Sequence, residues 1–402
     1  MTRMNGIAAL HGRVLLLISV AALAGCAGSA ANGPEPVSAA PLSARAALGE
    51  KIFHDASLSA SGRLSCAGCH DVDHALSGAD ALAVPLGGAG GAAQGRRNAP
   101  SLKYLASTPA FYFDAQGTPT GGFDRDGRAA TLAEQARGPF LTAFEMANAD
   151  AAAVADKLSR ADYAAEFRAE FGARIFDDPQ AAFERALLAL QAYQSEDRAE
   201  FAPFSSKFDA FLAGRAELSA AELRGFALFN DPQKGNCAGC HPSAPGPNGE
   251  PPLFTDFTYD NLGVPRNPAI VANADPGYFD LGLCGPERAD LAARLELCGA
   301  FKVPTLRNIA LTAPYFHNGR FATLREALRF YVRRDTNPDE WYPLDATGVV
   351  RKFDDLPAAY LANVNRTEVP YNRLRGDVPA LSEEQITDLI SFLQTLTDGF
   401  QP

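Results

Sequence analysis

One pentapeptide, CAGCH, occurs twice in the chain, at Cys66–His70 and at Cys237–His241. Cys-x-x-Cys-His is the attachment signature of a c-type haem: both thiols bond the porphyrin edge and the histidine becomes an axial iron ligand. Zinc sites also use Cys-x-x-Cys but need further Cys or His nearby, and thioredoxin-like redox pairs need no histidine. The repeated motif therefore predicts two covalently bound haem c groups. The predicted attachment and iron-binding residues are Cys66, Cys69, His70, Cys237, Cys240 and His241.

Two of the other three cysteines, Cys284 and Cys298, lie close together in the sequence. In an oxidising compartment this spacing predicts a disulfide that closes a small loop. Two buried, unreactive thiols are the alternative.

The N-terminus has the features of an export signal. Arg3 and Arg13 precede the apolar run Val14–Leu23, which is too short to span a membrane. The following Leu-Ala-Gly-Cys, ending at Cys26, resembles the lipobox of bacterial lipoproteins. We expect a signal peptide over residues 1–26, a lipidated Cys26 and a flexible tether over 27–41. The protein would then be lipid-anchored on the periplasmic side of a bacterial membrane; ordinary secretion with a stray cysteine is the alternative.

The composition excludes some functions. The chain has 402 residues, 47% of them hydrophobic, and a net charge of −11, whereas a nucleic-acid-binding protein needs a basic face. After residue 26 no apolar stretch approaches the length of a membrane span, so membrane contact is expected only through the lipid.

Apolar residues at helical spacing predict mostly α structure with long irregular loops. Capping boxes at Thr323/Glu326 and Ser382/Gln385 mark two helix starts. The predicted helices are Ala46–Phe53, Asp150–Ser159, Gln180–Tyr193, Ala220–Phe229, Leu324–Tyr331 and Ser382–Leu396.

We expect two cytochrome c-like haem domains, over residues 42–198 and 199–402, with the boundary near Asp197–Pro203. A distant duplication would explain them, although only the haem motif visibly repeats.

The sixth ligand of each iron decides what the haems can do. An iron with two protein ligands mainly transfers electrons, whereas an open face can bind peroxide or dioxygen. After loss of the signal peptide Met146 is the only methionine, and the spare histidines are His54, His74 and His317. His/Met ligation of both haems is thus not available, which favours at least one open or unusual site.

Several further stretches carry a resemblance to a known family. They include Ile52–Asp55, Gly95–Leu102, Asp126–Arg128, Glu134–Pro139, Phe301–Asn308 and Pro314–Gly319. With the two haem motifs, these make roughly residues 43–398 resemble the bacterial di-haem cytochrome c peroxidases, including the MauG branch, which oxidises protein side chains.

The resemblance implies roles for individual residues. His70 would hold the peroxide-reacting haem and His241 the electron-transfer haem. Glu145 would act as acid–base catalyst, taking a proton from peroxide and returning it to the departing oxygen. Gln135 and Pro139 match positions that line the same pocket. Without the resemblance, Glu145 reads as a solvated acid just before a helix.

The resemblance also implies two sets of metal ligands. Tyr331 matches the position of the second haem's distal ligand, which is methionine in the peroxidases and tyrosine in the MauG branch; an ordinary core tyrosine is the alternative. A calcium ion would be held by the Asn98 side chain and by the backbone carbonyls of Thr312 and Pro314. Plain loop structure is the alternative there.

Two departures from the family pattern stand out. The loop Leu86–Gln94 has Gly90 where the peroxidases carry a histidine that blocks the first haem at rest. Arg125 stands where the family usually has a tryptophan between the haems, and Trp341 is the only tryptophan in the chain. The first haem is therefore expected to have an open face at rest, unless His74 substitutes, and electrons need another route between the haems.

These observations predict a di-haem peroxidase that reduces hydrogen peroxide. Its electrons would come from a periplasmic donor, such as a small cytochrome or copper protein, or from a side chain of a protein substrate. A non-enzymatic periplasmic di-haem electron carrier is the alternative. The sequence leaves open whether the chain forms a homodimer.

Overall fold

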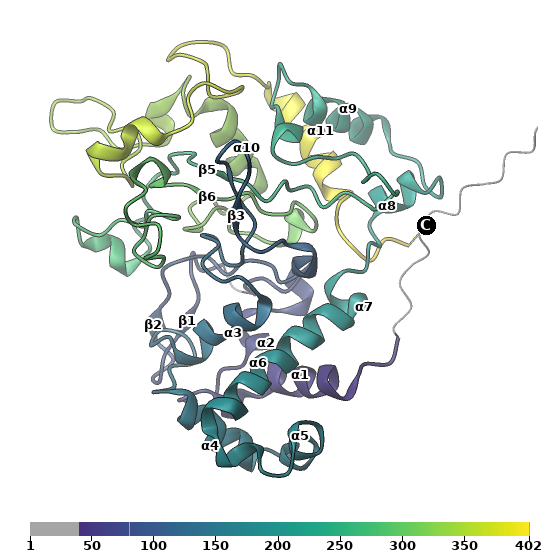
Figure 1. Ribbon diagram of the computed structural model, residues 1–402. Helices are drawn as coiled ribbons and strands as arrows, with labels where there is room; N and C mark the ends of the chain where they lie inside the picture. Colours follow the sequence, from purple (N-terminus) through teal and green to yellow (C-terminus); the bar gives the residue numbers. More distant parts are fainter. Residues whose placement is uncertain (1–39, 80, 402) are drawn as a thin grey trace, which may run out of the picture. The chain divides into compact units, whose positions relative to one another are not determined.

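The structure, a computed structural model, describes residues 40–79 and 81–401. The predicted signal peptide, the lipidated Cys26 and all of the tether before residue 40 lie outside these residues. The described residues belong to one compact unit, and helices account for most of its regular structure, as predicted (Figure 1). No helix among them is long and apolar enough to cross a membrane.

All six predicted helices are present, with ends within a few residues of those expected. Their bounds are α1 Ala44–His54, α4 Ala151–Arg160, α6 Pro179–Glu196, α9 Ala220–Asn230, α10 Leu324–Arg333 and α11 Glu383–Gln394. Each begins after a Ser, Thr or Asp whose side chain accepts a bond from the first turn. Both predicted capping boxes, at Thr323 and Ser382, are formed.

Five further helices among the described residues were not predicted. They are α2 Cys66–Cys69, α3 Leu132–Leu141, α5 Ala164–Phe171, α7 Arg198–Phe201 and α8 Lys207–Leu212. α3 has a glycine and a proline in its last turns, Gly138 and Pro139, which lower its intrinsic helix propensity.

Within residues 40–79 and 81–401, strands are limited to three antiparallel pairs of two residues each. They are β1 Leu86–Gly87 with β2 Ala93–Gln94, β3 Tyr112–Phe113 with β4 Pro119–Thr120, and β5 Tyr259–Asp260 with β6 Phe301–Lys302.

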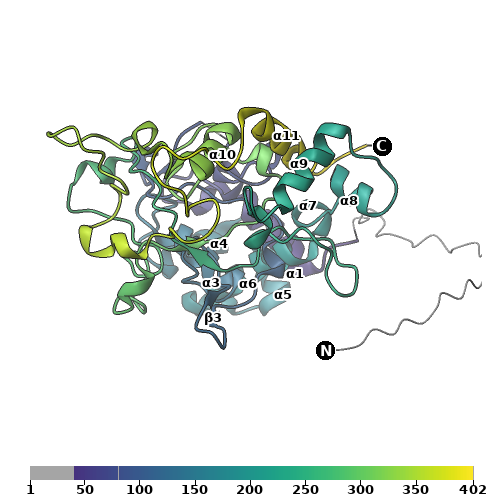
Figure 2. The same cartoon turned by 90° about the horizontal axis from the view of Figure 1, so that it is seen from above.

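A glycine lets two helices cross closely in each half of the chain. A Cβ on Gly49 of α1 would lie 2.0 Å from the Ala189 carbonyl oxygen of α6. A Cβ on Gly225 of α9 would lie 2.0 Å from the Asp388 carbonyl oxygen of α11. The two pairs, α1 with α6 and α9 with α11, lie apart in the fold, and the second pair is seen side by side from above (Figure 2).

Each helix pair has its own hydrophobic core. The core around α1 and α6 contains Phe53, Phe140, Phe183 and Tyr193. The core around α9 and α11 contains Phe208, Phe229, Phe254 and Phe392.

Matching crossings and separate cores are what a duplication would leave, and the duplication stays a prediction. So does the boundary at residues 198 and 199, which falls inside α7.

Candidate active site

The first haem motif forms the short helix α2, and His70 caps its C-terminal end. The chain then turns back, and the His70 Nδ1 lies 2.8 Å from the Leu76 carbonyl oxygen. Leu76 is fixed by burial of its side chain in the first core. An imidazole that donates from Nδ1 to a carbonyl has its Nε2 lone pair free for a metal.

The second motif repeats this arrangement. The His241 Nδ1 lies 2.7 Å from the carbonyl oxygen of Phe254, whose ring is fully buried in the second core. Burial lowers the pKa of both histidines, which favours the neutral form that binds metals.

A Pro-Ser/Thr-Leu segment supports each histidine from outside its motif. The Ser101 hydroxyl donates to the Ala75 carbonyl oxygen at 2.6 Å, one residue before Leu76. The Thr305 hydroxyl donates to the Leu253 carbonyl oxygen at 2.6 Å, one residue before Phe254. Pro100-Ser101-Leu102 and Pro304-Thr305-Leu306 are thus equivalent, and they are a repeat that the sequence analysis missed.

Both motifs open into one cavity of about 460 Å³. Its wall includes every predicted haem-binding and catalytic residue: Cys66, Cys69, His70, Cys237, Cys240, His241, Tyr331, Gln135, Pro139 and Glu145. Each half of the chain therefore presents two thiols and an oriented, neutral imidazole to the same cavity. This arrangement fits two covalently attached haems.

Glu145 lies on a turn after α3 and faces this cavity. Its backbone is held by the loop that lacks the expected histidine, because the Gly88 N–H donates to the Glu145 carbonyl oxygen at 2.7 Å. A Cβ on Gly87 would meet the Phe144 carbonyl oxygen at 2.4 Å, so this close contact requires glycine. Burial, with the negative charge of Asp124, raises the pKa of the Glu145 carboxyl to about 7. Such a group can both accept and release a proton near neutral pH.

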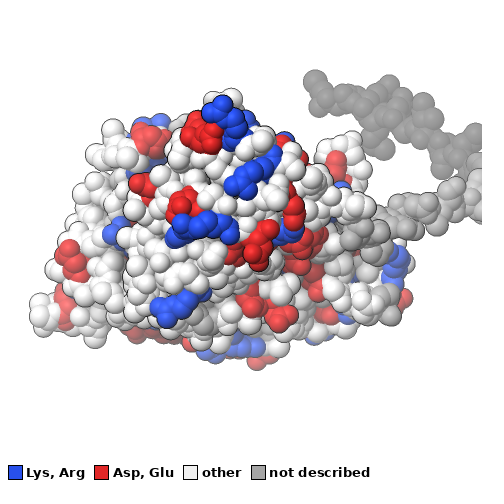
Figure 3. All heavy atoms as spheres, turned by 90° about the horizontal axis from the view of Figure 1, so that it is seen from below, with Lys and Arg blue, Asp and Glu red and all other residues white. Residues whose placement is uncertain are grey.

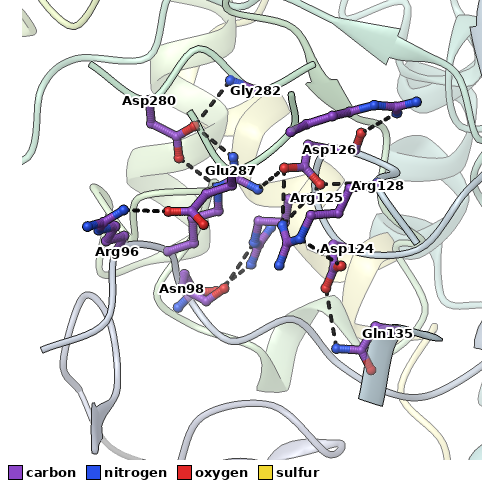
Figure 4. A network of polar contacts seen from close by, with 12 residues as sticks. Arg96, Asn98, Asp124, Arg125, Asp126, Arg128, Gln135, Asp280, Gly282 and Glu287 are labelled. Atoms are coloured by element: carbon purple, nitrogen blue, oxygen red, sulfur yellow. Dashed lines mark hydrogen bonds and ion pairs between the residues drawn. The ribbon is translucent and has the colours of Figure 1, made fainter. Parts of the chain in front are cut away.

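Gln135 and Pro139 lie on α3, on the same wall of the cavity. The Gln135 Nε2 lies 3.3 Å from an Asp124 carboxylate oxygen, so the amide supports Asp124 (Figure 4). The Pro139 carbonyl accepts a bond from the Met146 N–H at 3.0 Å and so fixes the residue next to Glu145. Asp124, which the sequence analysis missed, therefore connects the two predicted residues Gln135 and Glu145.

Tyr331 lies on α10 and faces the part of the cavity lined by the second motif. Its ring packs against those of Phe316 and Tyr371, with centroids 5.5 Å and 6.2 Å away. Burial and the nearby Cys237 and Cys240 thiols raise the pKa of the Tyr331 phenol.

The three predicted calcium ligands, Asn98, Thr312 and Pro314, also line the cavity. The Asn98 oxygens, however, already accept bonds from Arg125. The Arg125 Nη2 donates to the Asn98 side-chain oxygen at 2.6 Å, and its Nε donates to the Asn98 carbonyl oxygen at 3.0 Å (Figure 4). The Asn98 side chain therefore does not fit the role of a calcium ligand in this chain.

Gly90, His74, Trp341, Cys284 and Cys298 are not among the residues that line the cavity, although Leu86 and Gly87 at the start of the Leu86–Gln94 loop are. The Leu86–Gln94 loop is the β1–β2 hairpin, and a Cβ on Gly90 would meet open space. The His74 Nδ1 lies 2.9 Å from an Asp71 carboxylate oxygen. Trp341 packs on Phe321 and Phe330, in an aromatic cluster of the C-terminal half. Cys284 and Cys298 are joined in a disulfide.

A buried network of charges surrounds Arg125. Arg97 bonds to both carboxylate oxygens of Asp280, at 2.6 and 2.8 Å, and to Asp126 at 2.7 Å. Arg128 also bonds to Asp126, which is fully buried (Figure 4). Arg97 thus joins a carboxylate from each half of the chain. This network could not be predicted from the sequence, because its partners are far apart in the chain.

Comparison with known proteins agrees with this geometry. A sequence profile described as "Di-haem cytochrome c peroxidase" matches residues 43–217. The methylamine utilization protein MauG of Paracoccus denitrificans is 37% identical over 370 residues, which cover 88% of this chain and 89% of that protein. The chain belongs to the di-haem cytochrome c peroxidase family. It is therefore an oxidoreductase, and membership implies two haem c groups.

Further relatives also match both halves. The cytochrome c551 peroxidase of Nitrosomonas europaea is 32% identical over 336 residues, covering 81% of this chain and 86% of that protein. The crystal structure of the diheme peroxidase BthA from Burkholderia thailandensis matches with a TM-score of 0.81 and 42% identity, covering 90% of this chain and 87% of that one. The mostly helical fold predicted from the sequence is thus confirmed as that of the family.

Proposed function

We propose that this family member is a peroxidase that reduces hydrogen peroxide to water at the haem held by His70. Electrons would reach that haem through the one held by His241, from an external donor. The observation that carries the proposal is the position of Glu145: a carboxyl with a pKa near 7 on the wall of the cavity that both haem motifs share.

The residues of the chain supply the proton chemistry. When bound, the haems supply the iron that exchanges electrons with peroxide. The Glu145 carboxylate accepts a proton from one peroxide oxygen and, as the O–O bond breaks, returns it to the departing oxygen, which leaves as water. Two electrons and two protons in total turn one hydrogen peroxide into two waters. The Gly87–Gly88 backbone fixes the segment that carries Glu145, so the carboxyl needs little reorganisation.

We further propose that Tyr331 would be the second protein ligand to the iron of the haem held by His241. It shares the cavity wall with that motif, and its neighbours Phe316 and Tyr371 hold the ring in place. A bound iron would favour the phenolate, although burial alone raises the pKa of the phenol. An anionic oxygen ligand would lower the potential of that haem compared with methionine.

The electron donor is expected to be a small redox protein or an oxidisable side chain of a partner protein. The face shown in Figure 3 carries acidic and basic side chains next to one another, with no continuous patch of one sign. Recognition on that face would therefore depend on local pairing of charges more than on net charge.

We also propose that the protein is anchored by a lipid on Cys26 on the periplasmic side of a bacterial membrane. This proposal rests on the N-terminal sequence alone. A location there suits covalent haem and the Cys284–Cys298 disulfide.

Glu145→Gln tests the function. Loss of the acid–base group should lower the rate of peroxide reduction by the haem-loaded protein about 10²-fold or more. Glu134→Gln is the matched control, because Glu134 lies on α3 and bonds the Ala130 N–H instead of lining the cavity. Unchanged turnover by Glu145→Gln would refute the assignment. A resting spectrum with only low-spin iron and no response to peroxide would instead indicate an electron carrier.

A further inference from the structure

Arg125 occupies a junction between the two halves of the chain. Its guanidinium bonds to both oxygens of Asn98, at 2.6 and 3.0 Å. Its own carbonyl oxygen accepts a bond of 2.9 Å from the Lys302 N–H of β6. The Asn98 N–H in turn donates to the His317 carbonyl oxygen at 2.8 Å, close to Thr312 and Pro314 in the sequence. Arg125 therefore connects Asn98 in one half with β6 in the other.

The acceptors that Arg125 uses are of the type that a calcium ion needs. Calcium binds six to eight oxygens, among them amide and backbone carbonyls. A guanidinium presents several N–H donors in a fixed plane and satisfies the same oxygens without dehydrating a metal ion. The Asn98 side-chain oxygen accepts a bond of 2.6 Å from the Arg125 Nη2, so the guanidinium occupies space beside this oxygen that a ligated metal ion would need.

The surrounding charges also oppose a divalent cation next to Arg125. Burial and the nearby positive charge of Arg97 lower the pKa of Arg125 to about 10, so that it is still a cation at neutral pH. The carboxylates of the network are already engaged: Asp280 by Arg97, and Asp126 by Arg97 and Arg128. A divalent ion at Asn98 would face the Arg125 charge with no free carboxylate from these pairs to offset it.

We propose that the Arg125 guanidinium takes the place of the calcium ion at Asn98, so that a cation fixed in the sequence holds Asn98, whose backbone N–H bonds the His317 carbonyl of the other half. One residue thereby accounts for two features of this junction. Arg125 stands where the family usually has an inter-haem tryptophan, and it also bonds the Asn98 side-chain oxygen that the family resemblance assigned to calcium. This inference does not depend on the proposed function.

Metal analysis of the haem-loaded protein is the first test. After equilibration with calcium and gel filtration, we expect less than 0.1 calcium per chain. Treatment with a calcium chelator should leave the resting absorption spectrum unchanged and shift the midpoint of thermal unfolding by less than about 1 °C. One calcium per chain, or a spectral change on chelation, would overturn the proposal. This measurement needs no variant.

Arg125→Leu and Arg125→Trp form the second test, with Arg96→Gln as control. Arg96 is the nearby exposed arginine, and it pairs with Glu287 instead of Asn98 (Figure 4). In the presence of chelator, the midpoint of thermal unfolding of the Arg125 variants should lie several degrees below that of the native protein. Millimolar calcium should restore part of this loss of stability. Arg96→Gln should behave as the native protein in both media. Arg125 variants that are as stable as the native protein in chelator would contradict the proposal.

Discussion

At the scale of single residues, the environment of Glu145 turns an ordinary carboxyl into one that titrates near neutrality. The side chain lies on the cavity wall, and the Asp124 carboxylate adds a repulsive charge to the cost of burial. Gln135 affects Glu145 indirectly, because its amide bonds the Asp124 carboxylate. The positions of these groups matter more than their identities, since the same acid in solvent would stay ionised.

The pKa of Glu145 predicts the pH dependence of the reaction with peroxide. Only the carboxylate can accept the first proton, and its population grows as the pH rises through about 7. The second-order rate constant, measured by stopped flow, should therefore fall about tenfold per pH unit below this value. In Asp124→Asn this fall in rate should begin at a lower pH, because the substitution removes one cause of the raised pKa of Glu145. In Glu145→Gln the rate constant should not show this fall below pH 7. A native pH profile identical to that of Glu145→Gln would contradict the prediction.

At the scale of elements, two close helix crossings, each allowed by a glycine, fix the helices of the two halves. Gly49 brings α1 onto α6, and Gly225 brings α9 onto α11, each against a backbone carbonyl. Backbone atoms cannot move aside as a flexible side chain can. Any side chain at these positions must therefore push the helices apart.

Gly49→Ala and Gly225→Ala should each lower the free energy of unfolding by about 1–3 kcal/mol, the usual cost of overpacking. Gly138→Ala is the control, since this helical glycine of α3 has no atom within 4 Å of the added Cβ. It should change stability by less than about 1 kcal/mol, in the stabilising direction expected for helix propensity. Urea unfolding of the three variants measures these changes. Equal changes in the free energy of unfolding for all three would exclude the helix crossing as the cause.

At the scale of the whole molecule, buried charges join the two halves of the chain, each of which carries one haem motif. Arg97 binds Asp280 from one half and Asp126 from the other, and all three side chains are largely buried. Removal of one member of such a group leaves the others as uncompensated charges. The network therefore couples the stability of the two halves.

Arg97→Met should lower the free energy of unfolding by about 3–5 kcal/mol, because Asp126 and Asp280 then lose a buried partner. It should also split unfolding into two transitions, one for each half. The neighbouring Arg96 pairs with Glu287 at the surface, so Arg96→Met should cost less than about 1 kcal/mol. Calorimetry checks both effects, and a single unshifted transition for Arg97→Met would refute the coupling.

The helices could be predicted because their signals are local. Apolar spacing and caps such as Thr323 and Ser382 lie within one element. Helix α3 was not predicted because Gly138 and Pro139 weaken that local signal. Much of the site followed from the haem motifs and the family resemblance. The Arg125–Asn98 contact did not, because it joins two loop residues whose pairing depends on the tertiary fold.

The placement of the attachment cysteines also constrains the biogenesis of the holoprotein. In the folded chain, burial raises the pKa of the Cys66, Cys237 and Cys240 thiols to about 12. Thioether formation requires a reactive sulfur, and a thiol that stays protonated is a poor nucleophile. Attachment of the haems is therefore expected to precede closure of the fold around the two motifs.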